Sequence, residues 1–183
     1  GGIIIPQLDR TAEIGSSFIL GNTKFTTSLF HTKTEHEIRY NVLSGTNMND
    51  TNTTERKGVH LSTATLLSER LSLHTNSKLQ KAIYSDGEHE GRSLDLVPHL
   101  LVNARLNYKL ENDWSLGVVS NYAGSQYYVG SNDLASQYGE YKKMPSYIVT
   151  DLYANKKLGN WNLNLTVKNV TNERYSTFGG LNK

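Results

Sequence analysis

The chain has 183 residues, a net charge of +2, 37% hydrophobic residues and no cysteine. Its length suffices for one domain, while the missing cysteines exclude a disulfide scaffold and a thiolate zinc site. The small net charge gives no support to a nucleic-acid partner, and the lack of long apolar runs excludes a transmembrane helix, which needs about 18 or more apolar residues. The chain carries no signal-peptide pattern, and we expect it to be part of a longer protein.

Alternation of apolar and polar residues dominates the sequence, whereas helical periodicity is hard to find. Eight strands are predicted, over residues 11–20, 24–30, 57–68, 70–84, 97–110, 113–122, 146–158 and 161–168. The last is the clearest, since Trp161, Leu163, Leu165 and Val167 alternate with Asn162, Asn164, Thr166 and Lys168. Such alternation predicts strands with one apolar and one polar face.

The connections between these strands alternate between tight and long. Turn residues make the tight ones, at Gly21-Asn22, Ser68-Glu69, residues 111–113 and Gly159-Asn160. The long polar ones cover residues 44–57, 85–95 and 130–143. An antiparallel meander built in this way has all tight turns at one end. This sorting favours an outer-membrane β-barrel over a β-sandwich, and strands of about 9–11 residues or more are long enough to cross a bilayer.

Aromatic residues are sorted by their distance from the tight turns. Phe25, Tyr108, Trp114 and Trp161 lie near the turns, which predicts an aromatic girdle at one membrane interface. A second belt is predicted toward the long loops, from Tyr40, Tyr84, Tyr122, Tyr127 and Tyr147. The alternative is that tyrosines are simply common in β-proteins. With the girdle, the apolar face would contact outer-membrane lipid and the polar face would line a lumen.

Several segments, in order, resemble TonB-dependent outer-membrane receptors. The segment "LTVKNVTNERY" (165–175) is similar to the penultimate barrel strand of that family. Upstream, the matching segments are "IPQLDRTAEIGSSF" (5–18), "RKGVHLSTATLLSERLSLHTNSKL" (56–79), "LVPHLLVNARLNYKLENDWSLGVVSNYAGSQY" (96–127) and "MPSYIVTDLYANKKL" (144–158). The chain departs from the family at Gln7 and His60, where glutamate is usual. A narrower likeness to ferric-citrate and other iron-chelate receptors lies around residues 89–108.

The resemblance implies an all-β fold in which residues 1–183 form a C-terminal portion of a transmembrane barrel of roughly 22 strands. The plug domain and the closing strand would be absent from these residues. The implied function is TonB-dependent uptake of an iron chelate, with the TonB complex engaged through the missing N-terminal part. Uptake of another nutrient, such as cobalamin or a saccharide, remains an alternative, as does a secreted, soluble carbohydrate-binding module.

Enzymatic chemistry has no support in the sequence. There is no glycine-rich phosphate loop or nucleophile elbow, and no spacing of Ser, His and Asp singles out a triad, so no catalytic residue and no cofactor are predicted. The two Glu-His-Glu segments at 35–37 and 88–90 could supply metal ligands, but a solvated loop is favoured because adjacent strand residues face opposite ways.

Ligand capture is instead predicted in the long loops. Basic and tyrosine side chains suit an anionic iron chelate, because charge-assisted hydrogen bonds to carboxylates are strong. The candidates are Arg92, Tyr127, Tyr128, Tyr138, Tyr141, Lys142 and Lys143. Binding of lipopolysaccharide phosphate or solvent by the same loop residues is the competing interpretation.

Overall fold

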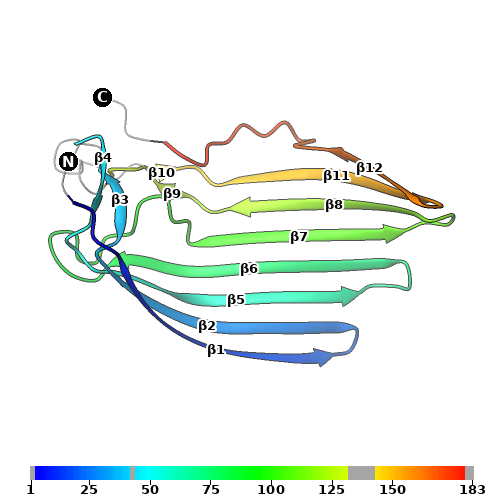
Figure 1. The fold of residues 1–183 in the computed structure, drawn as a ribbon. Coiled ribbons are helices and arrows are strands. Elements are labelled where there is room, and N and C mark those ends of the chain that lie inside the picture. Colours follow the sequence, from blue (N-terminus) through cyan, green and yellow to red (C-terminus); the bar gives the residue numbers. More distant parts are fainter. Residues whose placement is uncertain (1–2, 42–43, 132–142, 180–183) are drawn as a thin grey trace.

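The computed structural model describes residues 3–41, 44–131 and 143–179. Its main feature is one eight-stranded antiparallel sheet, ordered β1-β2-β5-β6-β7-β8-β11-β12 (Figure 1). These strands are β1 (Leu8–Leu20), β2 (Thr23–Glu35), β5 (Thr54–Leu66), β6 (Leu71–Tyr84), β7 (Leu100–Lys109), β8 (Trp114–Ala123), β11 (Tyr147–Leu158) and β12 (Trp161–Val167). Among the described residues the sheet is open, with β1 and β12 each paired on one side. The eight predicted strands are confirmed, although β1 and β2 are longer than expected, β5 begins at Thr54 within the predicted connection 44–57, and β7 is shorter than the predicted 97–110.

The predicted sorting of connections is also confirmed. Figure 1 shows the four tight turns at one end of the sheet and the long connections at the other. In the turn between β7 and β8, Asn112 and Asp113 both have positive φ, 57° and 59°, as a two-residue hairpin turn requires. Asn and Asp tolerate this conformation better than other side chains with a Cβ, which explains why turn chemistry in the sequence located the hairpin.

Two of the long connections contain short strands that the sequence did not predict. The connection after β2 forms a hairpin of β3 (Ile38–Asn41) and β4 (Thr46–Asn49), and the one after β8 contains the paired β9 (Gln126–Tyr127) and β10 (Lys143–Met144). These strands have only two to four residues, too few for a period-2 pattern to stand out from a polar loop.

The strand register separates the residues of the sheet into two faces. Along a strand, every second side chain lies on the same face of the sheet. Residues directly opposite each other on neighbouring strands also share a face. One face, here called the apolar face, includes Ile14, Phe18, Phe25, Leu29, Val59, Leu61, Leu79, Val102, Leu106, Leu116, Val118, Ile148, Leu152, Leu163 and Leu165. The polar face includes Glu13, Thr26, Ser62, His74, Asn76, Asn103, Arg105, Asn107, Asn121, Asp151, Asn155 and Asn164.

Hydroxyl groups on the apolar face are hydrogen-bonded to one another. The side-chain oxygens of Thr63 and Thr75 lie 2.7 Å apart, and those of Ser120 and Thr150 lie 3.0 Å apart. Each pair spans two neighbouring strands, so in each pair one hydroxyl donates a hydrogen bond to the other. An unsatisfied hydroxyl in hydrocarbon costs several kcal/mol, and this pairing makes the apolar face compatible with a lipid environment.

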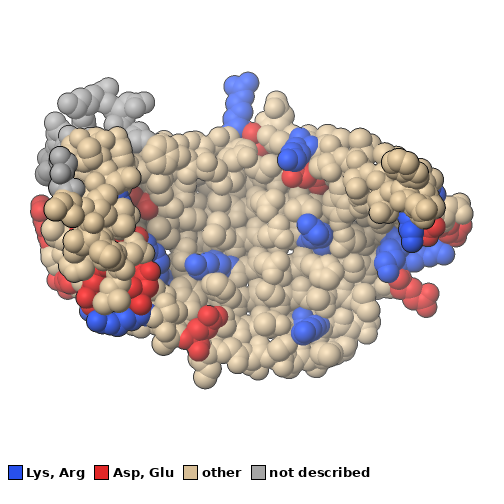
Figure 2. Space-filling model, in the orientation of Figure 1, with Lys and Arg blue, Asp and Glu red and all other residues tan. Residues whose placement is uncertain are grey.

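The polar face is tied together by side-chain hydrogen bonds that cross its strands. Asn103 donates to the Asn121 side chain at 2.7 Å, and Ser62 donates to Asn76 at 2.8 Å. The Tyr153 hydroxyl donates to Asn107 across Gly117, where no side chain intervenes. Figure 2 shows charged side chains gathered at the two ends of the molecule, with only scattered ones between them.

Little of the described chain is buried, because both faces of the sheet are largely open. The one cluster of buried apolar residues consists, within the described ranges, of Ala82, Tyr84 and Leu94, with Val97 packed against it at the long-loop end. The described residues contain no helix that is long and apolar enough to span a membrane. The sheet therefore gains its order mainly from strand pairing.

Candidate ligand-binding mouth

The long connections meet at one end of the sheet and form its mouth. Here lie the side chains with the lowest exposure in the described chain, those of Asp50, Thr54, Ser131 and Met144. Asp50 and Thr54 lie around the start of β5, whereas Ser131 and Met144 belong to the connection after β8. The mouth is thus an ordered assembly of loops over much of its extent, and its polar contacts decide which side chains remain available for a ligand.

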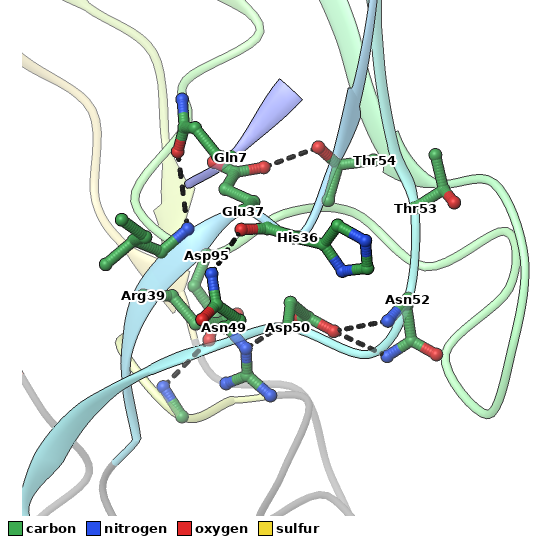
Figure 3. Close-up of polar contacts among 12 residues, drawn as sticks. Gln7, His36, Glu37, Arg39, Asn49, Asp50, Asn52, Thr53, Thr54 and Asp95 are labelled. Carbon is green, nitrogen blue, oxygen red and sulfur yellow. Dashed lines mark hydrogen bonds and ion pairs between the residues drawn. The ribbon is translucent and has the colours of Figure 1, made fainter. Parts of the chain in front are cut away.

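Asp50 and Asn49 hold the β3–β4 hairpin against the strands (Figure 3). The Asp50 carboxylate accepts hydrogen bonds from the backbone and the side chain of Asn52, at 2.8 and 2.9 Å, and pairs with Arg39. Asn49 donates to the His36 carbonyl at 2.7 Å and bridges to the backbone of Ile5. A hairpin this short is unstable alone, so these contacts fix its position.

A second acid–base pair lies beside the first. The Glu37 carboxylate accepts hydrogen bonds from Thr54 and from Arg56, the latter at 2.5 Å. Glu37, Arg39, Asp50 and Arg56 all line a cavity of about 240 Å³. Two carboxylates face two guanidinium groups, so this cavity has no net charge from them. A paired, partly buried network of this kind specifies geometry, and it offers no excess cation to an anionic chelate.

The loop after β6 is tied to the start of β5 by Asp86. The backbone N–H of Thr53 donates to the Asp86 carboxylate at 2.6 Å. Hydrogen bonds from the side chain and backbone of Thr53 lower the pKa of Asp86 below its ordinary value. The carboxylate is therefore fully ionised at neutral pH, and it holds the loop with a charge-assisted hydrogen bond.

The predicted capture residues are not all brought together. The backbone carbonyl of Arg92 accepts from Tyr84, and the adjacent pairing of Ser93 with Ile83 places Arg92 on the same face as Tyr84, the polar face. Tyr128 packs near Gly179 of the C-terminal segment, whose Tyr175 stacks on Tyr147 of the polar face. Tyr138, Tyr141 and Lys142 lie outside the described residues. For all of these residues, ligand capture stays a prediction.

Tyr127 and Lys143 lie elsewhere, in a groove of about 560 Å³. The Lys143 ammonium group lies 4.7 Å from the centre of the Tyr127 ring, within range of a cation–π contact. Lys57 and Lys81 also line this groove. Sequence analysis missed these two lysines because they lie inside strands. The signal that could have found them is that each is the charged residue next to an aliphatic residue on the same strand face, on the side of the long loops, Val59 for Lys57 and Leu79 for Lys81.

The four predicted girdle residues all belong to the apolar face. Phe25 stacks on Phe18 with ring centres 5.1 Å apart, and Lys156 lies 5.4 Å from the Trp114 ring centre. Tyr108 pairs with Leu116, and Trp161 with Leu158. All four lie toward the tight turns, as expected from their sequence positions. Their role as an interface girdle remains a prediction.

The second predicted belt is wrong for two of its members. Tyr84 and Tyr147 belong to the polar face, and Tyr84 is only 3% exposed. Of the three members of this set in the eight-stranded sheet, Tyr122 shares the apolar face, since it pairs with Ile148 and Val102. Distance from the long loops does not by itself determine which face a tyrosine belongs to, because neighbouring strand residues point to opposite faces.

The histidines of the two Glu-His-Glu segments have different local surroundings. His36 has a positive φ of 56° at the end of β2, whereas His89 is buried and packs edge-on against Tyr84 with ring centres 5.4 Å apart. Within the described ranges, no group of three or more His, Asp or Glu residues is arranged to hold a metal ion. The side chains of the mouth are hydrogen-bonding, aromatic and charged groups, which are suited to binding a ligand.

Comparison with known proteins agrees with this description. The family model for the TonB dependent receptor-like β-barrel matches residues 6–170. A search among curated proteins finds no match. Among solved structures, the ferric-catecholate import receptor Fiu from E. coli K12 aligns with a TM-score of 0.69 and 22% identity, over 97% of this chain and 25% of that chain.

Two further structures show the same fold. The ferric yersiniabactin uptake receptor FyuA from Yersinia pestis has a TM-score of 0.74 and 18% identity, over 97% of this chain and 27% of that one. The copper transporter OprC has a TM-score of 0.70 and 15% identity, over 94% of this chain and 27% of that one. The chain thus spans about a quarter of the length of each of these proteins.

Strand order, loop sorting and the two faces of the sheet are those of an outer-membrane barrel wall. Since the family model covers residues 6–170, the chain belongs to the TonB-dependent receptors and forms part of their β-barrel in the Gram-negative outer membrane.

Proposed function

We propose that the protein containing this chain is an active-transport receptor that takes up an iron chelate with energy supplied through TonB. Family membership over residues 6–170 is the observation that carries this proposal. Two of the similar structures are named as ferric import or uptake receptors and a third as a copper transporter. These names support a metal-bearing cargo as the first substrate class to test, with iron ahead of copper.

In this proposal residues 1–183 supply a stretch of the barrel wall, and the rest of the protein supplies the remaining strands, the plug domain and the contact with the TonB complex. The chain's span of about a quarter of the similar structures is consistent with that division. A secreted, soluble carbohydrate-binding module, the alternative from another class, does not fit a member of a membrane-barrel family. Uptake of cobalamin or a saccharide remains the runner-up.

The chelate is proposed to contact the polar side of the mouth. Arg92 and Tyr128 are the described candidates there, and Tyr138, Tyr141 and Lys142 are candidates from outside the described residues. The partly buried pairs of Asp50 with Arg39 and Glu37 with Arg56 would hold the loops in place. A guanidinium group such as that of Arg92 suits the carboxylate or catecholate oxygens of an anionic chelate.

The test is uptake of radiolabelled iron chelates by cells that carry the full-length receptor, with and without a working TonB. We expect iron uptake that disappears when TonB is deleted. Unchanged uptake without TonB would refute the mechanism. TonB-dependent uptake of cobalamin, a saccharide or copper without any iron would refute the iron chelate and keep the transport class.

A variant pair tests the capture residues. Arg92→Gln should weaken chelate binding more at low than at high ionic strength, because salt screens the attraction between the guanidinium group and an approaching anion over about 8–10 Å at physiological ionic strength. Lys157→Gln is a matched control, since Lys157 is exposed on the polar face but lies at the tight-turn end. An equal effect of the two substitutions would argue against a specific role for Arg92.

A further inference from the structure

The apolar face changes character abruptly toward the long loops. Leu29, Val59 and Leu79 form one row across β2, β5 and β6, and the next row consists of His31, Lys57 and Lys81. Successive rows on one face are roughly 7 Å apart along a strand. The transition from aliphatic to basic side chains therefore occurs within a single step, which marks the level at which the barrel wall leaves the hydrocarbon.

Positive charge predominates above this level. Counting the charged strand residues of β1, β2, β5 and β6 on this face, four cations (Arg10, Lys33, Lys57 and Lys81) stand against two carboxylates (Glu35 and Glu55). Arg10 pairs with Glu35 at 2.7 Å, and Glu55 accepts from Lys57 at 2.9 Å and lies 3.4 Å from His31. The patch thus keeps an excess of cations after its internal pairing.

The groove of about 560 Å³ lies at this transition. Lys57 and Lys81 from the basic row and Val59 and Leu79 from the apolar row all line it, and Lys143 of β10 completes its basic rim. Lys143 and Tyr127 face away from Gln126 and Met144, which contact the C-terminal segment on the polar side. The groove therefore opens on the lipid side of the wall.

We propose that this groove binds the phosphate-bearing headgroup of a lipid in the outer leaflet of the membrane. The three lysine ammonium groups would contact phosphate oxygens, since lysine binds phosphate as a point charge. The acyl chains would continue over Val59 and Leu79 onto the apolar face. A free anion in solution would use the lysines but gain nothing from these apolar residues, so the combination favours a lipid. This inference rests on the location in the outer membrane and not on transport.

The test uses the purified full-length receptor in detergent, with native mass spectrometry after addition of diphosphoryl lipid A. The variant is K57Q/K81Q, and the matched control is K24Q/K109Q, which changes two lysines of the polar face near the tight turns. We expect the control to bind as the unchanged protein does and the variant to bind roughly tenfold or more weakly, because each basic residue near an anionic surface contributes substantially to binding.

Further arms separate the sources of the phosphate. Binding of inorganic phosphate at the same concentrations as lipid A, or equal binding of a phosphate-free lipid, would overturn the proposal, as would unchanged lipid A binding by K57Q/K81Q. Should that variant fail to fold, as judged by heat-modifiable gel mobility, K143Q provides the same comparison from an exposed position in β10. Retained binding by K57R/K81R would support recognition by charge.

Discussion

Val118 and Val119 are identical neighbours that the strand register places in different surroundings. Val118 pairs with Leu106 and Leu152 on the apolar face, whereas Val119 pairs with Arg105 and Asp151 on the polar face. The two positions have the same residue type and almost the same depth in the membrane. A difference in stability between the same substitution at each position therefore reports only which face of the sheet the side chain lies on.

We expect Val118→Arg to destabilise the folded barrel by about 2–4 kcal/mol, the cost of placing a cation on the lipid face near the midplane. Val119→Arg should cost much less, because the new guanidinium group can reach Asp151. Refolding titrations of the full-length barrel into lipid vesicles measure both. Equal losses at the two positions would contradict the assignment of faces.

At the scale of elements, the approach of β5 to β6 depends on a glycine. Gly58 lies opposite Gln80, and a Cβ added at this position would lie 2.9 Å from the Gln80 Cα and 3.0 Å from the Phe30 ring. It would also approach the backbone carbonyl of Leu79, which cannot move without displacing β6. The sheet at this point requires the smallest residue for reasons of space.

Gly58→Ala should therefore destabilise the barrel by about 1–3 kcal/mol, as overpacking does elsewhere. Ser62→Ala is the control on the same strand and face, since it removes only the hydrogen bond to Asn76. Urea unfolding in lipid vesicles gives both values. A smaller loss for Gly58→Ala than for Ser62→Ala would show that the two strands separate more easily than the structure indicates.

At the scale of the whole molecule, the orientation of the sheet in the membrane follows from its two kinds of connection. Barrels of this class have short periplasmic turns and long extracellular loops. The chain contains no cysteine, so a cysteine introduced at either end of the sheet would be the only thiol among these 183 residues, and the receptor without the substitution serves as the labelling control.

We expect Glu88→Cys, in the exposed loop after β6, to react on intact cells with a maleimide reagent too large to cross the outer membrane. Asn160→Cys, in the turn between β11 and β12, should react only after permeabilisation. Labelling of Asn160→Cys on intact cells would show that the assigned topology is inverted.

Much of this architecture was predictable from local sequence. Alternation along 161–168 and turn chemistry at Asn112-Asp113 are properties of a few adjacent residues, and they predicted strands, turns and faces correctly. The family resemblance rested on the order of such segments. These features are readable because a membrane wall imposes the same period on every strand.

The sequence by itself determined the meander, the sorting of its connections and the parity of each strand, because these depend on spacing along the chain. Only the tertiary structure decided how the mouth is assembled. The contacts of Asp86 with Thr53 and of Asn49 with Ile5 join distant segments, and the groove brings Lys57, Lys81 and Lys143 together across three strands. Such neighbours are set by register and loop packing between strands, and no spacing within one strand encodes them.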